Sequence, residues 1–179
     1  MGHIASVRCP EKGDVGVSRT KTLTSTALFT ALITVGTLYL KVPGPTGYYH
    51  LGDGLIYTAA LVLGLWPAAF AAAVGSALAD VLGGFAGFAV WTFLIKGLTS
   101  IVVTSVAKGK PSRNLMAMVL GAIVTVAGYA IATTVMFDAQ AAMAETLGNF
   151  AQTGAGVIVG LALVPISGKA LGGRQGQSQ

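Results

Sequence analysis

The sequence predicts an all-α integral membrane protein, a bundle of six transmembrane helices with both termini in the cytoplasm. The first observation is the composition: 54% of the 179 residues are hydrophobic, 9% are charged and the mean hydropathy is +0.75. Ordinary soluble domains carry about a quarter charged residues. The second is the recurrence of apolar runs of about 20 residues, the length with which a helix crosses a bilayer. The third is the lack of alternating apolar and polar residues, which argues against a membrane β-barrel.

The apolar runs set the number of helices. They cover residues 23–40, 51–82, 88–107, 115–136 and 147–167. The second run, with about 32 residues, is too long for one simple span and short for two. Its middle reads Gly-Leu-Trp-Pro, Gly64 to Pro67, a combination typical of a tight turn at the membrane interface. A short helical hairpin divided at this turn brings the number of helices to six.

The basic residues favour six spans over five, because Lys and Arg prefer cytoplasmic loops. With six spans, nine of the eleven basic residues share one side, whereas with five spans the same nine divide four against five. These nine are Arg8, Lys12, Arg19, Lys21, Lys108, Lys110, Arg113, Lys169 and Arg174. Both termini are therefore predicted to be cytoplasmic. Orientation explains the net charge of +5 without a nucleic-acid partner.

The segments outside the bundle are short. Residues 1–22 are predicted to be a cytoplasmic segment, partly disordered, 23–168 a single membrane domain, and 169–179 a cytoplasmic tail. The run 23–40 is long for the core of a signal peptide and no small-x-small cleavage site follows it, so we expect a retained first span. Cys9 has no second cysteine for an internal disulfide and no metal-ligand spacing around it.

Between the first two runs lies Lys41–Gly54, KVPGPTGYYHLGDG, which we expect to form a bend-rich loop. Its two prolines and four glycines prevent a helix through its first part. Tyr48 and Tyr49 either cover an outer pocket or simply lie at the membrane interface. His50 and Asp53 are three residues apart at the start of the next helix, which we expect Asp53 to cap. One histidine and one aspartate are too few to predict a metal site.

Lys96 is the most unusual polar residue, about nine residues into a helix that begins near Phe88. An ionisable group at that depth is costly unless it is paired, faces water or contacts a ligand. Its expected partner is Asp80, which precedes the turn Gly-Gly-Phe-Ala-Gly. Two interpretations remain open: a structural Asp–Lys pair or snorkelling, and a lysine in a substrate pocket.

Amides and hydroxyls in the last two runs form a second group of candidates. Asn149 and Gln152 are three residues apart, and Thr153 is four from Asn149. Amides at membrane depth require partners, which are either neighbouring helices or a polar heterocycle. Weaker candidates of the same kind are Tyr129, Thr133 and Thr134.

Ala27 and Ala31 in the first run form a small-xxx-small pair, which allows another helix to approach closely. The alternative is packing within the bundle. The sequence has no Walker A loop, no His-Glu-x-x-His, no Gly-x-Ser-x-Gly and no paired catalytic carboxylates. It therefore predicts a protein that is not an enzyme and that does not use ATP itself.

The stretch YYHLGDGLIYTAALVLGLWPAAFAAAVGSALADVLGG, followed by FAVWTFLIKGL, resembles the S component of energy-coupling factor (ECF) vitamin transporters, their substrate-binding membrane subunit. The elements His-Leu-Gly-Asp, Gly-Ser-Ala-Leu-Ala-Asp and Ile-Lys-Gly carry the resemblance together, and it extends from Thr24 to about Lys169. The most similar branch is the riboflavin-type one, which includes transporters of pyridoxine-like and hydroxymethylpyrimidine-like precursors.

The resemblance implies a six-helix subunit of the bacterial plasma membrane that captures a B vitamin or vitamin precursor in an outward-facing pocket, with no cofactor. It implies that the loop Lys41–Gly54 is a lid. The implied docking face for a transmembrane T component is Ala27 and Ala31, and two ATPase subunits would supply energy. The implied substrate contacts are Tyr48, Tyr49, His50, Asp80, Trp91, Lys96, Asn149 and Gln152.

Two other classes of function remain open on the residues alone. In a self-contained secondary transporter, Asp80 and Lys96 would form a proton-coupled pair. A non-transporting scaffold would bind no small molecule. Aromatic rings, amides and one lysine suit a flat, polar heterocycle such as pyridoxine, hydroxymethylpyrimidine, a thiamine fragment or riboflavin. The pocket size that would separate these ligands does not follow from the sequence.

Overall fold

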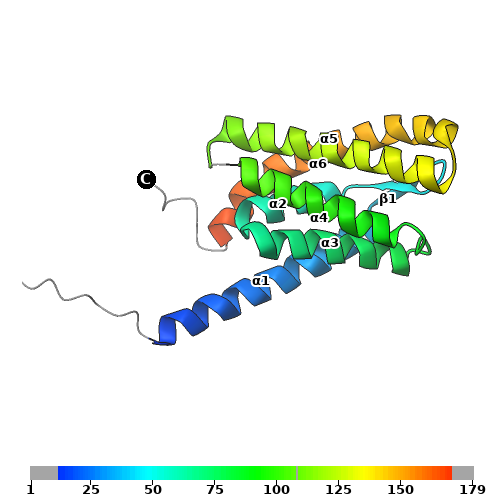
Figure 1. Cartoon of the computed structure of the whole chain (residues 1–179). Coiled ribbons are helices and arrows are strands. Elements are labelled where there is room, and N and C mark those ends of the chain that lie inside the picture. Colours follow the sequence, from blue (N-terminus) through cyan, green and yellow to red (C-terminus); the bar gives the residue numbers. More distant parts are fainter. Residues whose placement is uncertain (1–11, 108, 171–179) are drawn as a thin grey trace, which may run out of the picture.

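Six helices and one β-hairpin form the part of the chain that the computed structural model describes, residues 12–107 and 109–170 (Figure 1). In chain order they are α1 (Lys12–Tyr39), β1 (Lys41–Pro43), β2 (Tyr48–His50), α2 (Gly52–Val62), α3 (Leu65–Leu82), α4 (Ala89–Val106), α5 (Pro111–Met136) and α6 (Ala139–Ala170). Every helix except α2 contains a stretch long and apolar enough to cross a membrane. The helical class is confirmed. Six spans remain a prediction, because the 11 residues of α2 cover only about 16 Å.

The break predicted at Gly-Leu-Trp-Pro is confirmed. Helix α2 ends at Val62, and Gly64 adopts a φ of 91°, a left-handed conformation that favours glycine. Trp66 and Pro67 lie in the first turn of α3, where proline is tolerated because the first amide groups of a helix have no intrahelical acceptor.

Three helices begin earlier than the apolar runs predict. Helix α1 starts at Lys12, so residues 12–22 are helical. Helix α5 starts at Pro111, whose fixed φ suits the first helical position. Helix α6 starts at Ala139, because Asp138 Oδ1 accepts a hydrogen bond of 2.7 Å from the Ala141 amide and caps the helix. The N-terminal segment 1–22 and the tail 169–179, as predicted, therefore overlap α1 and α6, and their remaining residues, 1–11 and 171–179, lie outside the described residues.

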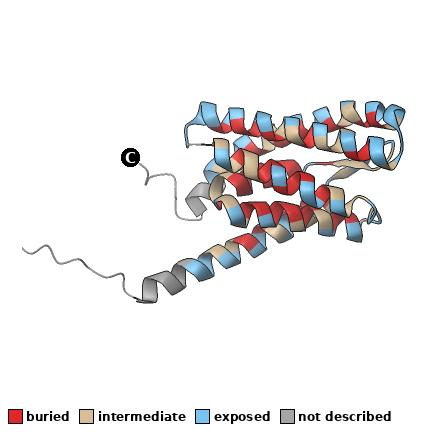
Figure 2. Ribbon diagram, in the orientation of Figure 1, coloured by how far each residue is buried: buried red, intermediate tan, exposed pale blue. Residues whose placement is uncertain are grey.

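The short helix α2 occupies the centre of the bundle, in contact with α1, α3, α4 and α6, and most of its residues are buried (Figure 2). Ile56 and Tyr57 are fully buried in the core, where Phe29 and Ile33 of α1 also lie. Helices α2 and α6 approach closely through glycine, since a Cβ added at Gly156 would lie 2.7 Å from the Cβ of Asp53. This close approach brings the polar residues of both helices together.

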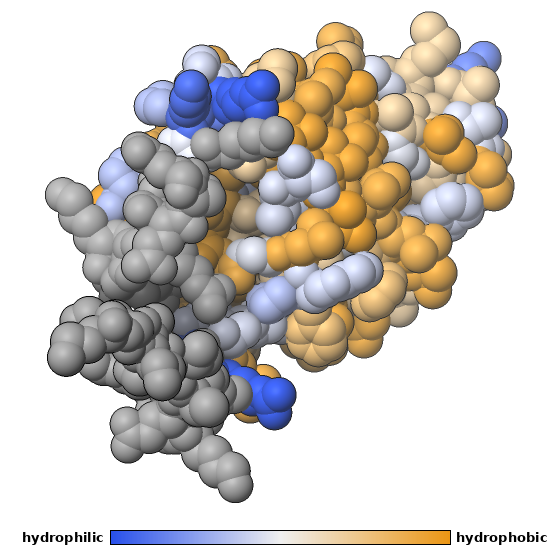
Figure 3. Space-filling view, turned by 60° about the vertical axis from the view of Figure 1, so that its left-hand side comes forward, coloured by the Kyte–Doolittle hydropathy of each residue, from blue (hydrophilic) through white to orange (hydrophobic). Residues whose placement is uncertain are grey.

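The two ends of the bundle differ in structure and in charge. Figure 1 shows the β-hairpin at one end, and the start of α1, the end of α4, the start of α5 and the end of α6 at the other. Four basic residues belong to this second end: Arg19, Lys21, Lys110 and Arg113. A broad hydrophobic band covers the side of the bundle that faces the viewer in Figure 3. The grouping agrees with the predicted topology, whereas the side of the membrane that each end faces stays a prediction.

Candidate functional site

A cavity of about 40 Å³ lies beneath the β-hairpin. Its walls come from the hairpin, the end of α3, the turn before α4, and α4, α5 and α6. The lining residues are Thr46, Gly47, Tyr48, His50, Asp80, Phe85, Phe88, Thr92, Tyr129, Thr133, Glu145, Asn149 and Gln152. Segments far apart in the sequence therefore meet around one small polar and aromatic space.

The roof of the cavity is more regular than the loop that the sequence predicts. Strands β1 and β2 pair antiparallel, with Lys41 opposite His50 and Pro43 opposite Tyr48. The turn is closed by a hydrogen bond of 3.0 Å from the Gly44 amide to the Gly47 carbonyl. Prolines are tolerated in such an edge strand because it needs few backbone donors. The end of the predicted lid segment, Gly52–Gly54, belongs to α2 instead.

Tyr48 fastens one side of the hairpin to α3. Its hydroxyl donates a hydrogen bond of 2.6 Å to Asp80 Oδ1, and its ring centroid lies 4.8 Å from that of Phe85. The Lys41 Nζ lies 4.6 Å from the centroid of the Tyr48 ring, a cation–π geometry. Burial, and then the Asp80 carboxylate, raise the pKa of Tyr48, so the phenol remains a donor.

Tyr49 and Thr46 fasten the other side to α6. The Thr46 amide and hydroxyl donate to Glu145 Oε1 at 2.6 and 2.7 Å. The Tyr49 ring packs on Gly148, where a Cβ would overlap the ring. Burial and the neighbouring Glu145 carboxylate raise the pKa of Tyr49 to about 12. The glycine at 148 is therefore what allows the hairpin to lie against α6.

Replacing Gly148 with alanine is expected to displace Tyr49 and weaken ligand binding about tenfold, because the new methyl group overpacks the contact. Binding to the purified variant, measured by calorimetry, checks this. The matched control is Gly154→Ala in the same helix, where a Cβ meets no atom within 4 Å and affinity should not change. Equal affinities of the two variants would show that the contact between the hairpin and α6 does not support the site.

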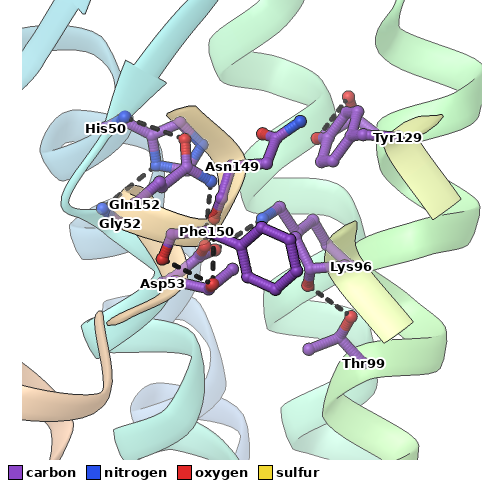
Figure 4. Close-up of polar contacts among 12 residues, drawn as sticks. His50, Gly52, Asp53, Lys96, Thr99, Tyr129, Asn149, Phe150 and Gln152 are labelled. Atoms are coloured by element: carbon purple, nitrogen blue, oxygen red, sulfur yellow. Dashed lines mark hydrogen bonds and ion pairs between the residues drawn. The ribbon is translucent and has the colours of Figure 1, made fainter. Parts of the chain in front are cut away.

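Beneath the hairpin, a chain of polar contacts runs from His50 to Lys96 (Figure 4). Gln152 Oε1 accepts a hydrogen bond of 3.0 Å from the His50 amide, and Gln152 Nε2 donates one of 2.9 Å to Asp53 Oδ2. The Lys96 Nζ forms an ion pair of 2.5 Å with Asp53 Oδ1. It also lies 5.2 Å from the centroid of the Tyr129 ring. The Gln152 side-chain amide thus connects the hairpin to the buried ion pair of Lys96 and Asp53.

Two predictions about these residues are wrong. Lys96 pairs with Asp53 of α2, whereas Asp80 accepts the hydrogen bond from Tyr48. Asp53 does not cap α2: the N-cap residue is Leu51, which precedes α2, and the Asp53 carboxylate faces Lys96 and Gln152. The physical reason is solvation, because a fully buried ammonium group requires a counter-charge, whereas a helix end can be satisfied in several ways.

His50 is buried in the roof and is held as the neutral imidazole. Its Nδ1 accepts a hydrogen bond of 3.1 Å from the Gly52 amide, which a protonated ring could not do. Burial lowers the pKa of His50 to about 4; the Lys96 and Lys41 ammonium groups act in the same direction and Asp53 opposes them. His50 lies in β2, so the helical face that it was predicted to share with Asp53 does not form.

The depressed pKa of His50 predicts that stability is lost on acidification. Between pH 6.5 and about 4 the unfolded chain binds a proton at this site that the folded protein does not. The free energy of unfolding therefore falls with decreasing pH, by up to about 1.4 kcal/mol per unit. Thermal denaturation in detergent from pH 7.5 to 4.5 tests this against His50→Gln. An identical pH dependence in the variant would contradict the assignment to His50.

The structure gathers most, but not all, of the sequence-predicted site residues. Tyr48, His50, Asp80, Asn149 and Gln152 line the cavity. Lys96 and Tyr49 contact lining residues, Tyr129 and Glu145 respectively. Trp91 is half-buried on α4 and is not a lining residue. The weaker candidates Tyr129 and Thr133 line the cavity, whereas the Thr134 hydroxyl bonds within its own helix.

Sequence reasoning missed several residues of the site: Thr46, Phe85, Phe88, Thr92, Glu145 and, in the ion pair, Asp53. Phe85 lies within the Gly-rich turn after Asp80 and Phe88 directly follows it, a recognisable signal for a wall of the same pocket. Asp53 lies between two glycines at the start of an apolar helix, where a charge requires a partner. Within residues 12–107 and 109–170, no group of three or more His, Cys, Asp or Glu could hold a metal ion.

The outer face of α1 is a second surface of interest. Ala27 and Ala31 are exposed, and the exposed residues Leu23 and Val35 continue the same row at intervals of four. The buried residues of α1, including Phe29 and Ile33, face the core instead. Packing within the bundle therefore does not explain the alanine pair. The two small side chains form a narrow strip on this exposed face of α1.

Comparison with known proteins gives two findings. A family model described as ECF-type riboflavin transporter, S component, matches residues 17–170. A protein of Pyrococcus woesei, described as "Uncharacterized protein in gap 3'region", is 37% identical over 144 residues. The match covers 78% of this chain and 97% of that protein.

Proposed function

We propose that the chain, which belongs to the family of ECF-type riboflavin transporter S components, captures a B vitamin or vitamin precursor in the cavity beneath the β-hairpin. The observation that carries this proposal is the cavity itself. Polar and aromatic side chains from the hairpin and four helices converge there, in an otherwise apolar bundle. A few convergent polar groups with aromatic walls are typical of small-molecule sites.

In this proposal the hairpin is a lid that opens for the ligand. A cavity of about 40 Å³ has room for only a few water molecules. A vitamin therefore enters only if the hairpin moves away from α3 and α6. Such opening breaks the hydrogen bonds that hold the hairpin in place, from Tyr48 to Asp80 and from Thr46 to Glu145.

The captured substrate would then be delivered with a T component and two ATPases. The exposed strip with Ala27 and Ala31 supports α1 as the docking face, because small residues let another helix approach closely. The basic residues at the other end of the bundle support a cytoplasmic location for that end, so in this proposal the hairpin lies on the outer side of the plasma membrane.

Reconstitution in vesicles tests this proposal. The chain alone should bind a labelled vitamin without accumulating it, and accumulation should require the T component, both ATPases and ATP. Ala27→Leu with Ala31→Leu should retain binding and lose accumulation. Ala127→Leu, at an exposed position of α5, is the matched control. Accumulation by the chain alone under an ion gradient would favour the secondary transporter instead.

A further inference from the structure

The charged residues that line the cavity are all acidic. Among the described residues that line it, Asp80 and Glu145 are acidic and none is Lys or Arg. The two nearby ammonium groups are engaged elsewhere: Lys96 with Asp53, and Lys41 over the rings of Tyr48 and Phe85. The lining is therefore formally anionic in a low-dielectric environment, where charge strongly selects what can bind.

The two carboxylates differ in how far their oxygens are already occupied by hydrogen bonds within the protein. Glu145 Oε1 already accepts two hydrogen bonds from Thr46, which hold the carboxylate against the hairpin. Asp80 Oδ1 accepts one from Tyr48. Its Oδ2, however, is buried and has no hydrogen-bond partner among the described residues. An unpaired buried acceptor is costly, and a ligand that carries a donor would remove that cost.

Two hydroxyl groups line the same cavity, and one of them, that of Thr92, acts on the Asp80 carboxyl. The hydroxyls of Thr92 and Tyr129, which line the same cavity, form a hydrogen bond of 3.0 Å. Phe85 and Phe88 add aromatic surface to the walls, which suits a flat ring. The site thus combines walls for a planar heterocycle with one buried acceptor that lacks a donor.

We infer that the captured ligand is an aromatic heterocycle bearing an amino or ammonium group, which donates to Asp80 Oδ2, and that the site prefers it to its oxo or hydroxyl counterpart. This inference rests on the proposed function and narrows its substrate class. An ionised carboxylate is an acceptor only, so the oxygen of an oxo group, also an acceptor, would be repelled there. A hydroxyl group can donate to the carboxylate but brings no positive charge. A donor bound to positively charged nitrogen would in addition neutralise the lining.

Matched pairs of probes test the inference on the wild-type protein. Pyridoxamine is compared with pyridoxine, and thiamine with oxythiamine, by calorimetry on detergent-purified protein, with riboflavin as the uncharged reference. In whichever pair binds, the amino member should bind about tenfold tighter or more. Asp80→Asn should abolish this preference. Asp138→Asn, which removes an exposed carboxylate at the start of α6, should keep it.

The possible failures are distinguishable. If pyridoxine, oxythiamine or riboflavin binds as tightly as the amino members or more tightly, the substrate class is overturned while vitamin capture stands. If no member of the panel binds, both the capture function and the inference are overturned. Because the comparison of probes uses the unmodified chain, it tests the inferred preference for amino-bearing ligands even if Asp80→Asn does not fold.

Discussion

Replacing Lys96 with methionine is expected to lower the free energy of unfolding by about 3–5 kcal/mol, because Asp53 would be left buried without its counter-charge. Both side chains are almost completely buried, so water cannot replace the lost partner. Methionine keeps most of the volume of lysine, which limits the contribution of a cavity. For a chain of this size the melting temperature should fall on the order of 10 °C, as measured by thermal denaturation in detergent.

A double variant separates the ion pair from general packing damage. Asp53→Asn combined with Lys96→Met removes both charges and can keep an amide near Gln152, so it should recover part of the loss. Asp80→Asn combined with Lys96→Met should recover none, because Asp80 bonds to Tyr48 instead. A single Lys96→Met variant that melts like the wild type would contradict the pair as described.

Replacing both Tyr48 and Tyr49 with alanine is expected to weaken ligand binding about 100-fold while the helical bundle stays folded. The change removes the hydrogen bond to Asp80, the ring contact with Phe85 and the packing on Gly148. These contacts contribute about 1 kcal/mol each to holding the lid closed. Ligand affinity by calorimetry and helix content by circular dichroism check the two halves of the prediction.

The matched control for the lid is Tyr39→Ala. Tyr39 is 79% exposed at the end of α1, at the same end of the bundle, and makes none of the lid contacts described above. Its replacement should leave affinity unchanged. A double tyrosine variant that binds as tightly as Tyr39→Ala would show that the hairpin does not act as a lid.

Composition and apolar run length were sufficient to predict the helical membrane class, and Gly64 with Pro67 predicted the break between α2 and α3. The helix ends were less predictable, because Asp138 and Pro111 extend helices beyond the apolar runs that hydropathy detects. The hairpin was not predicted, since strands of three residues carry no periodic signal. Such strands depend on tertiary contacts, here with α3 and α6.

The sequence predicts which residues belong to the site better than it predicts which of them interact with each other. Unusual polar residues in apolar runs pointed to Asp80, Lys96, Asn149 and Gln152, and the structure brings them to one end of the bundle. Which carboxylate meets Lys96 depends on how α2 packs against α4, a three-dimensional contact between distant segments. Sequence spacing within one helix does not contain that information, and the predicted pair of Lys96 with Asp80 is wrong for this reason.

Mass spectrometry of the small molecule released when the detergent-purified protein is denatured tests the central claim most directly. If the cavity beneath the hairpin captures a vitamin tightly, a B vitamin or vitamin precursor should be released in stoichiometric amount, and the Tyr48→Ala, Tyr49→Ala variant should release much less. A protein that is empty after purification and shows no thermal shift with a panel of B vitamins would contradict the claim.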